Sequence, residues 1–299
     1  MKGTNRRSII LLFLCLILLA ASIALQYKGN NSKNIDTEDK QTQGSQVEIS
    51  TSHQNLTNEE NTDKPIPTKI IEAEDVLNEE YDKESLSQLP AATIINIDEA
   101  NDTEMDTYFY YEEISENLYN RIKGKSYGED CTVSLDDLRY VRVLHYGFDE
   151  NTHIGELIVN KAIAKDVIDI FKELYEAKYP IERMVLVDEY NADDNTSMAA
   201  NNTSSFNFRP VPGADHLSKH ALGLAIDINP LYNPYVQYDD NETIILPVEG
   251  TKYADRSLNN PYYIKENDIL FNAFNKRGFN WGGFWKSEPD YQHFVKKID

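Results

Sequence analysis

The C-terminal half of the chain is organised around the stretch SKHALGLAID, residues 218–227. His220 and Asp227 are seven residues apart. On one continuous helix this spacing would separate them by about 10 Å along the axis, too far to share one metal ion. From 224 to 228 apolar residues alternate, so Asp227 falls on the strand face opposite Ile226. We therefore predict a bend at Gly223 followed by a strand, which brings His220 and Asp227 together.

A second stretch near the C-terminus, WGGFWKSEPDYQHF at 281–294, supplies the remaining chemistry. A carboxylate among core-forming residues, such as Asp227, is costly unless it is paired or bound to a metal. A catalytic zinc takes three protein ligands and keeps one position open for water. His293 is the natural third ligand. Asp290, three residues earlier, is placed to hold the attacking water and to accept its proton as general base.

These two stretches resemble the zinc D-Ala-D-Ala carboxypeptidase superfamily. That superfamily includes VanY-like D,D-carboxypeptidases, VanX-like D,D-dipeptidases and L-alanyl-D-glutamate endopeptidases. Its pattern, Ser-x-His-x-x-Gly-x-Ala-x-Asp followed by Asp or Glu-x-x-His, is matched at every fixed position. The resemblance implies one Zn²⁺ per chain on His220, Asp227 and His293, with Asp290 as the base. The WGG run at 281–283 is most similar to the endopeptidase branch.

The resemblance also implies residues that contact the substrate. Arg209, in the run SFNFR at 205–209, is similar to the family's arginine that binds substrate and stabilises the tetrahedral oxyanion. Ser218 is a second candidate for substrate binding. It is better placed to orient His220 or the adjacent turn than to act as a nucleophile, because no Ser–His–acid arrangement is visible. Two departures from the family are Val295, where an acidic residue is common, and a long insertion over 231–263.

The pattern of apolar residues predicts the fold class. Periodicity and β-branched runs predict helices over 111–122, 163–174 and 269–274, and strands over 138–146, 184–187 and 224–228. Asn160 is expected to cap the second helix and Gly278 to end the third. Strands and helices do not alternate regularly, which indicates an α+β domain over 106–299 with its motif-bearing core at 180–299. The resemblance implies a small, mostly antiparallel sheet with flanking helices and a single zinc site, the Hedgehog/DD-peptidase-like fold.

The N-terminus has the pattern of an export signal. Lys2, Arg6 and Arg7 precede an apolar run over 9–25 that only Ser22 interrupts. Residues 1–27 are predicted to be an uncleaved signal anchor, or a signal peptide cleaved near Ser22-Ile23-Ala24. Residues 28–105 are polar and acidic with few aromatics, so we expect a disordered stalk. The protein is then expected at the bacterial cell surface, held by one transmembrane segment, or secreted if the signal is cleaved.

The charge and the cysteine count exclude several classes of partner and site. The chain has 29 Lys and Arg against 50 Asp and Glu, a formal net charge of -21. Nucleic acid demands a basic patch, so it is excluded as a partner. The charge also opposes self-association, so we expect a monomer. Cys15 lies in the apolar run, which leaves only Cys131 in the folded part, with no disulfide and no Cys-based metal site.

The remaining histidines and tyrosines are assigned structural roles. His216 forms a His-x-x-x-His pair with His220, but Pro212 and Gly213 make a helix unfavourable there, so His216 is predicted to lie in a loop. His145 is expected in a strand and His153 in a turn, neither as a ligand. The tyrosines between 232 and 263 are interpreted as packing residues and not as a sugar-stacking surface.

Three functions remain open from the sequence. The first is a zinc peptidase acting on peptidoglycan stem peptides, either at D-Ala-D-Ala as a carboxypeptidase or at L-Ala-D-Glu as an endopeptidase. The second is a non-catalytic, zinc-containing binding module of the Hedgehog-like fold at the cell surface. The third is an adhesin without metal. Asp290 favours the enzyme, since a binding module can dispense with a base.

Overall fold

The computed structural model describes residues 88–97, 105, 107–211, 216–238 and 243–298. The predicted membrane segment and all of the predicted stalk before residue 88 lie outside these residues. None of the helices in the described part of the chain is long and apolar enough to cross a membrane.

The largest sheet is built on a hairpin of two nine-residue strands, β3 (Leu138–Tyr146) and β4 (Thr152–Asn160). Two short strands, β2 (Tyr110–Glu112) and β1 (Ile94–Ile95), extend it to the antiparallel order β1-β4-β3-β2. The strand predicted over 138–146 is confirmed, and its β-branched and aromatic residues suit a pleated, half-buried surface.

Strand β1 shows that the folded region begins earlier than predicted. Ile94 pairs with His153 on the outer edge of β4, and the backbone N–H of Ala92 donates to the Ile154 carbonyl at 2.7 Å. Ile95 is buried. The boundary at residue 106 is therefore too late, because a short apolar pair within a polar segment is sufficient to cover an open sheet edge.

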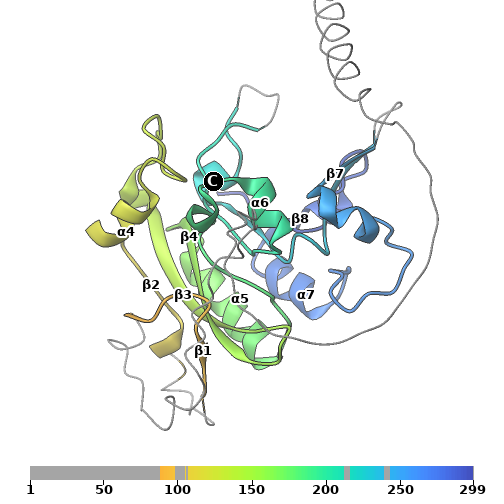
Figure 1. Cartoon of the computed structure of the whole chain (residues 1–299), viewed down its shortest axis with the longest axis horizontal. Helices are drawn as coiled ribbons and strands as arrows, with labels where there is room; N and C mark the ends of the chain where they lie inside the picture. The colour runs from red at the N-terminus through yellow and green to blue at the C-terminus, as the bar shows by residue number, and fades with distance from the viewer. Residues whose placement is uncertain (1–87, 98–104, 106, 212–215, 239–242, 299) are drawn as a thin grey trace, which may run out of the picture. The chain divides into compact units, whose positions relative to one another are not determined.

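Helix α5 (Ala164–Glu176) packs on β3 (Figure 1), and α7 (Ile269–Asn275) packs against α5. The apolar residues of α5 are buried. Phe171 of α5 and Phe274 of α7 meet edge to face with ring centroids 6.5 Å apart. Both predicted helices are confirmed, but their ends differ from the prediction. The Asn160 Oδ1 accepts from the Ala162 N–H in the turn before α5, so it does not cap the helix. Gly278, at φ +82, lies in the turn after α7 and not at its last residue.

Two predicted elements are wrong. Residues 111–122 are not one helix: Tyr111 lies in β2, and α4 (Glu116–Ile122) begins only after Ser115, whose Oγ accepts from the Leu118 N–H at 3.2 Å.

Residues 184–187 form no strand within the described chain. The buried Asn202 side chain accepts from the Val185 N–H at 2.9 Å and donates to the Val185 carbonyl at 3.0 Å. A side-chain amide thus takes the place of a neighbouring strand. The short 3-10 helix η2 (Val187–Tyr190) and helix α6 (Asp194–Ala199) follow.

The C-terminal part adds two small antiparallel sheets. The first has the order β5-β9-β8, from β5 (Ala225–Asp227), β8 (Phe279–Trp281) and β9 (His293–Lys296). The second pairs β6 (Tyr235–Tyr238) with β7 (Thr243–Leu246) inside the predicted insertion. Short 3-10 helices complete the described elements: η1 (Leu135–Asp137), η3 (His220–Leu222), η4 (Val248–Tyr253) and η5 (Gly282–Phe284). The predicted α+β class with small antiparallel sheets is confirmed.

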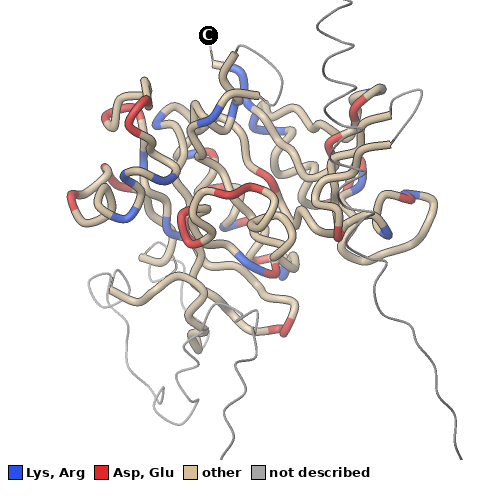
Figure 2. Tube along the Cα trace, turned by 45° about the horizontal axis from the view of Figure 1, so that its top comes forward, with Lys and Arg blue, Asp and Glu red and all other residues tan. Residues whose placement is uncertain are grey.

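One hydrophobic core joins the largest sheet to the sheet β5-β9-β8. Val141 and Leu157 of the first, Phe171 of α5, and Ile226 and Phe294 of the second belong to the same buried cluster. Lys and Arg are interspersed with Asp and Glu over the described chain (Figure 2).

Candidate metal centre

His220 is held by a tight turn at the end of the largest sheet. It begins η3, and Gly223 follows with φ +64, so the bend predicted there is confirmed. A Cβ at Gly223 would lie 2.6 Å from the backbone nitrogen of Asn160, which itself donates to the Gly223 carbonyl at 2.8 Å. Only glycine fits both this conformation and this close approach. The turn thus fixes His220 to the end of β4.

One hydrogen bond holds the His220 backbone, and another orients its imidazole. Its backbone N–H donates to Ser218 Oγ at 3.2 Å, so Ser218 contacts the turn that carries His220, while its orienting role and its substrate binding stay predictions. Its Nδ1 lies 2.7 Å from the Ser205 carbonyl oxygen. A carbonyl only accepts, so Nδ1 carries the proton and the lone pair of Nε2 is left to face a cation.

Strand register brings Asp227 and His293 face to face. β5 and β9 are antiparallel, and Asp227 is the Cα partner of His293. Directly opposite residues of an antiparallel pair project to the same face. The backbone N–H of Asp227 donates to the Ser204 carbonyl at 2.9 Å, which fixes the other edge of β5.

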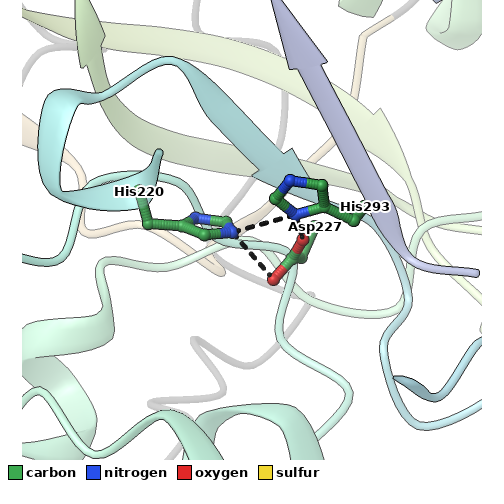
Figure 3. Close-up of side chains that lie close together, drawn as sticks. All are labelled: His220, Asp227 and His293. Carbon is green, nitrogen blue, oxygen red and sulfur yellow. Dashed lines mark hydrogen bonds and ion pairs between the residues drawn. The ribbon is translucent and has the colours of Figure 1, made fainter. Parts of the chain in front are cut away.

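The three predicted ligands converge at one point (Figure 3). Asp227 Oδ1 lies 2.9 Å from His293 Nδ1, and Asp227 Oδ2 lies 3.2 Å from His220 Nε2. The two imidazole nitrogens are 3.2 Å apart. One ligand atom from each residue lies within 4.8 Å of the others, so among the described residues these three form a group that could hold a metal ion.

The electrostatics of this group favour a cation. Burial by itself would raise the pKa of Asp227, but His220 and His293 hold that pKa well below its usual range. Burial by itself would lower the pKa of His220, but the Asp227 carboxylate raises it overall. The buried, ionised Asp227 carboxylate therefore stabilises a positive charge beside it, which can be a proton on His220 or a metal ion in its place. Two imidazoles and one carboxylate are the donor set of a catalytic zinc with an open fourth position, so the residues fit the metal that the resemblance implies.

Asp290 lies beside the ligands without joining them. Its Oδ2 is 4.0 Å from His293 Nδ1, and its Oδ1 is buried with no hydrogen-bond partner within the described chain. Burial raises the pKa of Asp290 to about 6, although His293 lowers it in part. About 15% of the side chain remains exposed, which leaves room for contact with substrate.

Gly282 allows the approach of this loop. The backbone N–H of Asp290 donates to the Gly282 carbonyl at 3.1 Å, and a Cβ at Gly282 would lie 2.7 Å from the Asp290 carbonyl oxygen. The first glycine of the WGG run is therefore required because the Asp290 backbone leaves no space for a side chain there.

Arg209 lies at the edge of the centre. Its carbonyl accepts from the Ser218 N–H at 3.1 Å, and about 32% of its side chain is exposed. Its positive charge is close enough to oppose protonation of His220 and so to reduce the rise in the pKa of that residue. The structure thus brings Arg209 to the site, and its catalytic role stays a prediction.

The predicted insertion contributes a neighbour that the sequence did not reveal. Tyr235 of β6 forms an antiparallel bridge with Asp290, and the Val236 N–H donates to the Pro289 carbonyl at 2.9 Å. Gln237 and Glu288 form the next pair on that face, with Nε2 and Oε1 3.4 Å apart. Burial, with Glu288 and Asp290 nearby, raises the pKa of Tyr235 to about 12.

The other histidines stay apart from the metal group. His216 is not among the residues that converge in the described chain. His145 lies in β3 as predicted, whereas His153 lies in β4 and not in a turn. The two rings stack with centroids 5.2 Å apart.

The family model described as D-alanyl-D-alanine carboxypeptidase matches residues 212–296, which contain all three converging residues and Asp290. Residues 212–296 carry a D-alanyl-D-alanine carboxypeptidase domain. The resemblance to this family is therefore confirmed. No curated protein and no solved structure gave a significant match.

The family description is that of a peptidase, an enzyme that acts on peptide bonds. Within that carboxypeptidase domain, His220, Asp227 and His293 are a plausible metal site for a zinc peptidase. Arg209 and Ser205 lie before residue 212, outside the matched segment, so their positions at the centre come from the structure alone.

Proposed function

We propose that the protein is a zinc peptidase that hydrolyses peptide bonds in the stem peptides of peptidoglycan. The observation that carries this proposal is the convergence of His220, Asp227 and His293 with Asp290 beside them, inside the D-alanyl-D-alanine carboxypeptidase domain. A structural zinc is usually closed by four protein ligands, whereas three ligands leave a position for chemistry.

Each residue has a distinct task in this proposal. A zinc ion on the three ligands would polarise the scissile carbonyl and acidify the attacking water. Asp290, with a pKa of about 6, is mostly ionised at neutral pH. It accepts the proton of the attacking water and then delivers that proton to the leaving amine. Arg209 donates hydrogen bonds to the substrate and to the oxyanion that forms at the scissile carbonyl of the substrate.

Two bonds are compatible with this chemistry. The family description supports cleavage at D-Ala-D-Ala, and the WGG run at 281–283 is similar to endopeptidases that cut L-Ala-D-Glu. The two reactions release different products from the same stem peptide: a single D-Ala in the first case, and a peptide beginning with D-Glu in the second.

Digestion of purified muropeptides, with mass analysis of the products, tests the proposal. Zinc-loaded protein is expected to give one of the two products, and His293→Ala is expected to give neither. Intact muropeptides after incubation with fully zinc-loaded protein would refute the peptidase. Binding of the same muropeptides without cleavage would support the Hedgehog-like binding module instead.

We further propose that the apolar run over 9–25 holds this domain at the outer cell surface. The support is the positive flank before that run and the location of peptidoglycan outside the membrane. Protease treatment of intact cells should remove the domain from the membrane fraction. Protein found only in the medium, beginning near Leu25, would favour a cleaved signal.

A further inference from the structure

Arg209 is held by a carboxylate from a different part of the chain. Its Nε forms an ion pair with Oδ2 of Asp194, the first residue of α6. Among the described residues this ion pair is the contact of the buried Nε, which makes no hydrogen bond there. The ion pair thus occupies the Nε side of the planar group and uses neither Nη group within the described residues.

Asp194 is itself fixed on its other oxygen. Its Oδ1 accepts from Asn207 Nδ2 at 2.8 Å, and the same Nδ2 donates to the Ala192 carbonyl at 3.1 Å. Asn207 is buried, and its backbone N–H donates to the carbonyl of His220 at 3.3 Å. A continuous set of contacts therefore connects Asp194 to a metal ligand as well as to Arg209.

The charges agree with this geometry. A guanidinium without a counterion would repel a divalent cation nearby, and Asp194 balances that charge. The Arg209–Asp194 ion pair can then lie next to a metal ion while the Nη groups of Arg209 bind a substrate.

We infer that Asp194 is a positioning residue that holds Arg209 with its Nη groups directed to a carboxylate of the peptide substrate. The inference rests on the proposed function. A guanidinium recognises a carboxylate best through two parallel N–H donors, and a fixed fork loses less freedom on binding than a mobile one. Both candidate substrates carry a carboxylate near the cut bond: the C-terminal one of D-Ala, or one belonging to D-Glu.

Asp193 provides a matched control. Its side chain caps α6 by accepting from the Thr196 N–H at 2.7 Å, and Asp194 holds the next position of the same turn. Asn is as good an N-cap as Asp, so Asp193→Asn removes one negative charge without loss of the cap. Asp194→Asn removes the same charge from the residue that contacts Arg209.

The experiment measures kcat, KM and zinc content for the zinc-loaded wild type, Asp193→Asn, Asp194→Asn, Asp194→Glu, Arg209→Ala and the double variant Asp194→Asn/Arg209→Ala. The substrate is the muropeptide that the wild type cleaves, and the same peptide with its carboxylate converted to an amide is the comparison. Asp194→Asn should lower kcat/KM about tenfold, mainly through KM, because Arg209 then loses a charge-assisted hydrogen bond to the substrate carboxylate. Zinc content should not change, Asp194→Glu should recover part of the loss, and Asp193→Asn should match the wild type.

The double variant separates positioning from a general structural effect. If Asp194 acts through Arg209, Asp194→Asn should cause no further loss of kcat/KM in the Arg209→Ala background. For the amidated peptide, Asp194→Asn and the wild type should have the same kcat/KM. Equal losses in both backgrounds, equal losses for both peptides, or no loss at all in Asp194→Asn or in Arg209→Ala would overturn the inference.

The inference can also fail separately from the proposed function. Direct binding of the uncleaved peptide to zinc-loaded wild type and Asp194→Asn can be measured by calorimetry even if no bond is cut. Absence of cleavage refutes the peptidase alone, whereas equal affinities of the two proteins refute the role of Asp194.

Discussion

Replacing Asp290 with Asn should separate proton transfer from metal binding. The amide has nearly the size of the carboxylate but cannot accept a proton from the attacking water at neutral pH. Asp290 is not part of the group His220, Asp227 and His293 that could hold a metal ion among the described residues, and its Oδ2 lies 4.0 Å from Nδ1 of His293. Because Asp290 is not a ligand, the three residues that hold the metal should assemble unchanged.

The size of the effect follows from the task assigned to this residue. General acid–base help is worth about 10²–10⁴-fold in rate, or about 3–5 kcal/mol of activation free energy. The loss should appear in kcat with KM little changed, since the interaction is made in the transition state. The Oδ1 of Asp290 is already buried without a partner in the described chain, so an amide there should not break an existing hydrogen bond.

The assay compares product release from muropeptides with zinc content for Asp290→Asn, Asp227→Asn and Glu288→Gln. Asp227→Asn should lose metal affinity together with activity, because a neutral amide oxygen is a poor zinc ligand. Glu288→Gln, which changes the nearest other carboxylate of the same loop, should retain activity. Full activity of zinc-loaded Asp290→Asn would refute the assignment of the base, and Glu288 would be tested next.

Three further predictions concern the metal and the stability of the fold. His220→Ala or His293→Ala should abolish tight binding of the single zinc; elemental analysis after dialysis would contradict this if either variant kept close to one equivalent. Gly223→Ala should reduce the free energy of urea unfolding by about 2 kcal/mol or more, since φ is +64 and the new Cβ would lie 2.6 Å from a backbone nitrogen. Gly124→Ala is the control: φ is +74 but no atom lies within 4 Å, so about 1 kcal/mol is expected, and equal losses would exclude the steric contribution. Burial, with His153 nearby, lowers the pKa of His145 to about 3. Below the usual value of about 6.5 the unfolded chain therefore binds a proton that the folded chain does not, and stability falls by up to about 1.4 kcal/mol per pH unit as the pH drops toward 3. His145→Asn should show a smaller loss between pH 6.5 and 4, measured by denaturant unfolding, and an unchanged slope would contradict the assignment.

The sequence alone was sufficient for the elements with strong local patterns. The nine-residue strand β3 and the helix α5 follow from periodic apolar residues that can bury only one face. The candidate ligands were also visible, because the bend at Gly223 and the alternation around Asp227 are local properties of one ten-residue stretch. Asp290 and His293 share a single turn, so their relation to each other was readable as well.

Local patterns misled where a distant polar group completed the structure. Residues 184–187 have the composition of a strand, but the buried Asn202 amide satisfies the Val185 backbone in place of a neighbour. The pair Ile94–Ile95 is too short to stand out in a polar segment, and it is ordered because β4 offers an open edge. In both cases the backbone hydrogen-bonding groups found partners far away in sequence, which composition does not record.

The tertiary structure alone decided how the centre is assembled. Asp227 and His293 are 66 residues apart, and the register of β5 against β9 places them opposite each other. The Ser205 carbonyl that orients His220, the Asp194 carboxylate that holds Arg209, and the bridge between Tyr235 and Asp290 are likewise contacts between separate segments. The physical reason is that a single stretch determines which residues can turn or alternate. Which stretches lie side by side is determined by burial of all the apolar faces at once, together with a partner for every buried polar group.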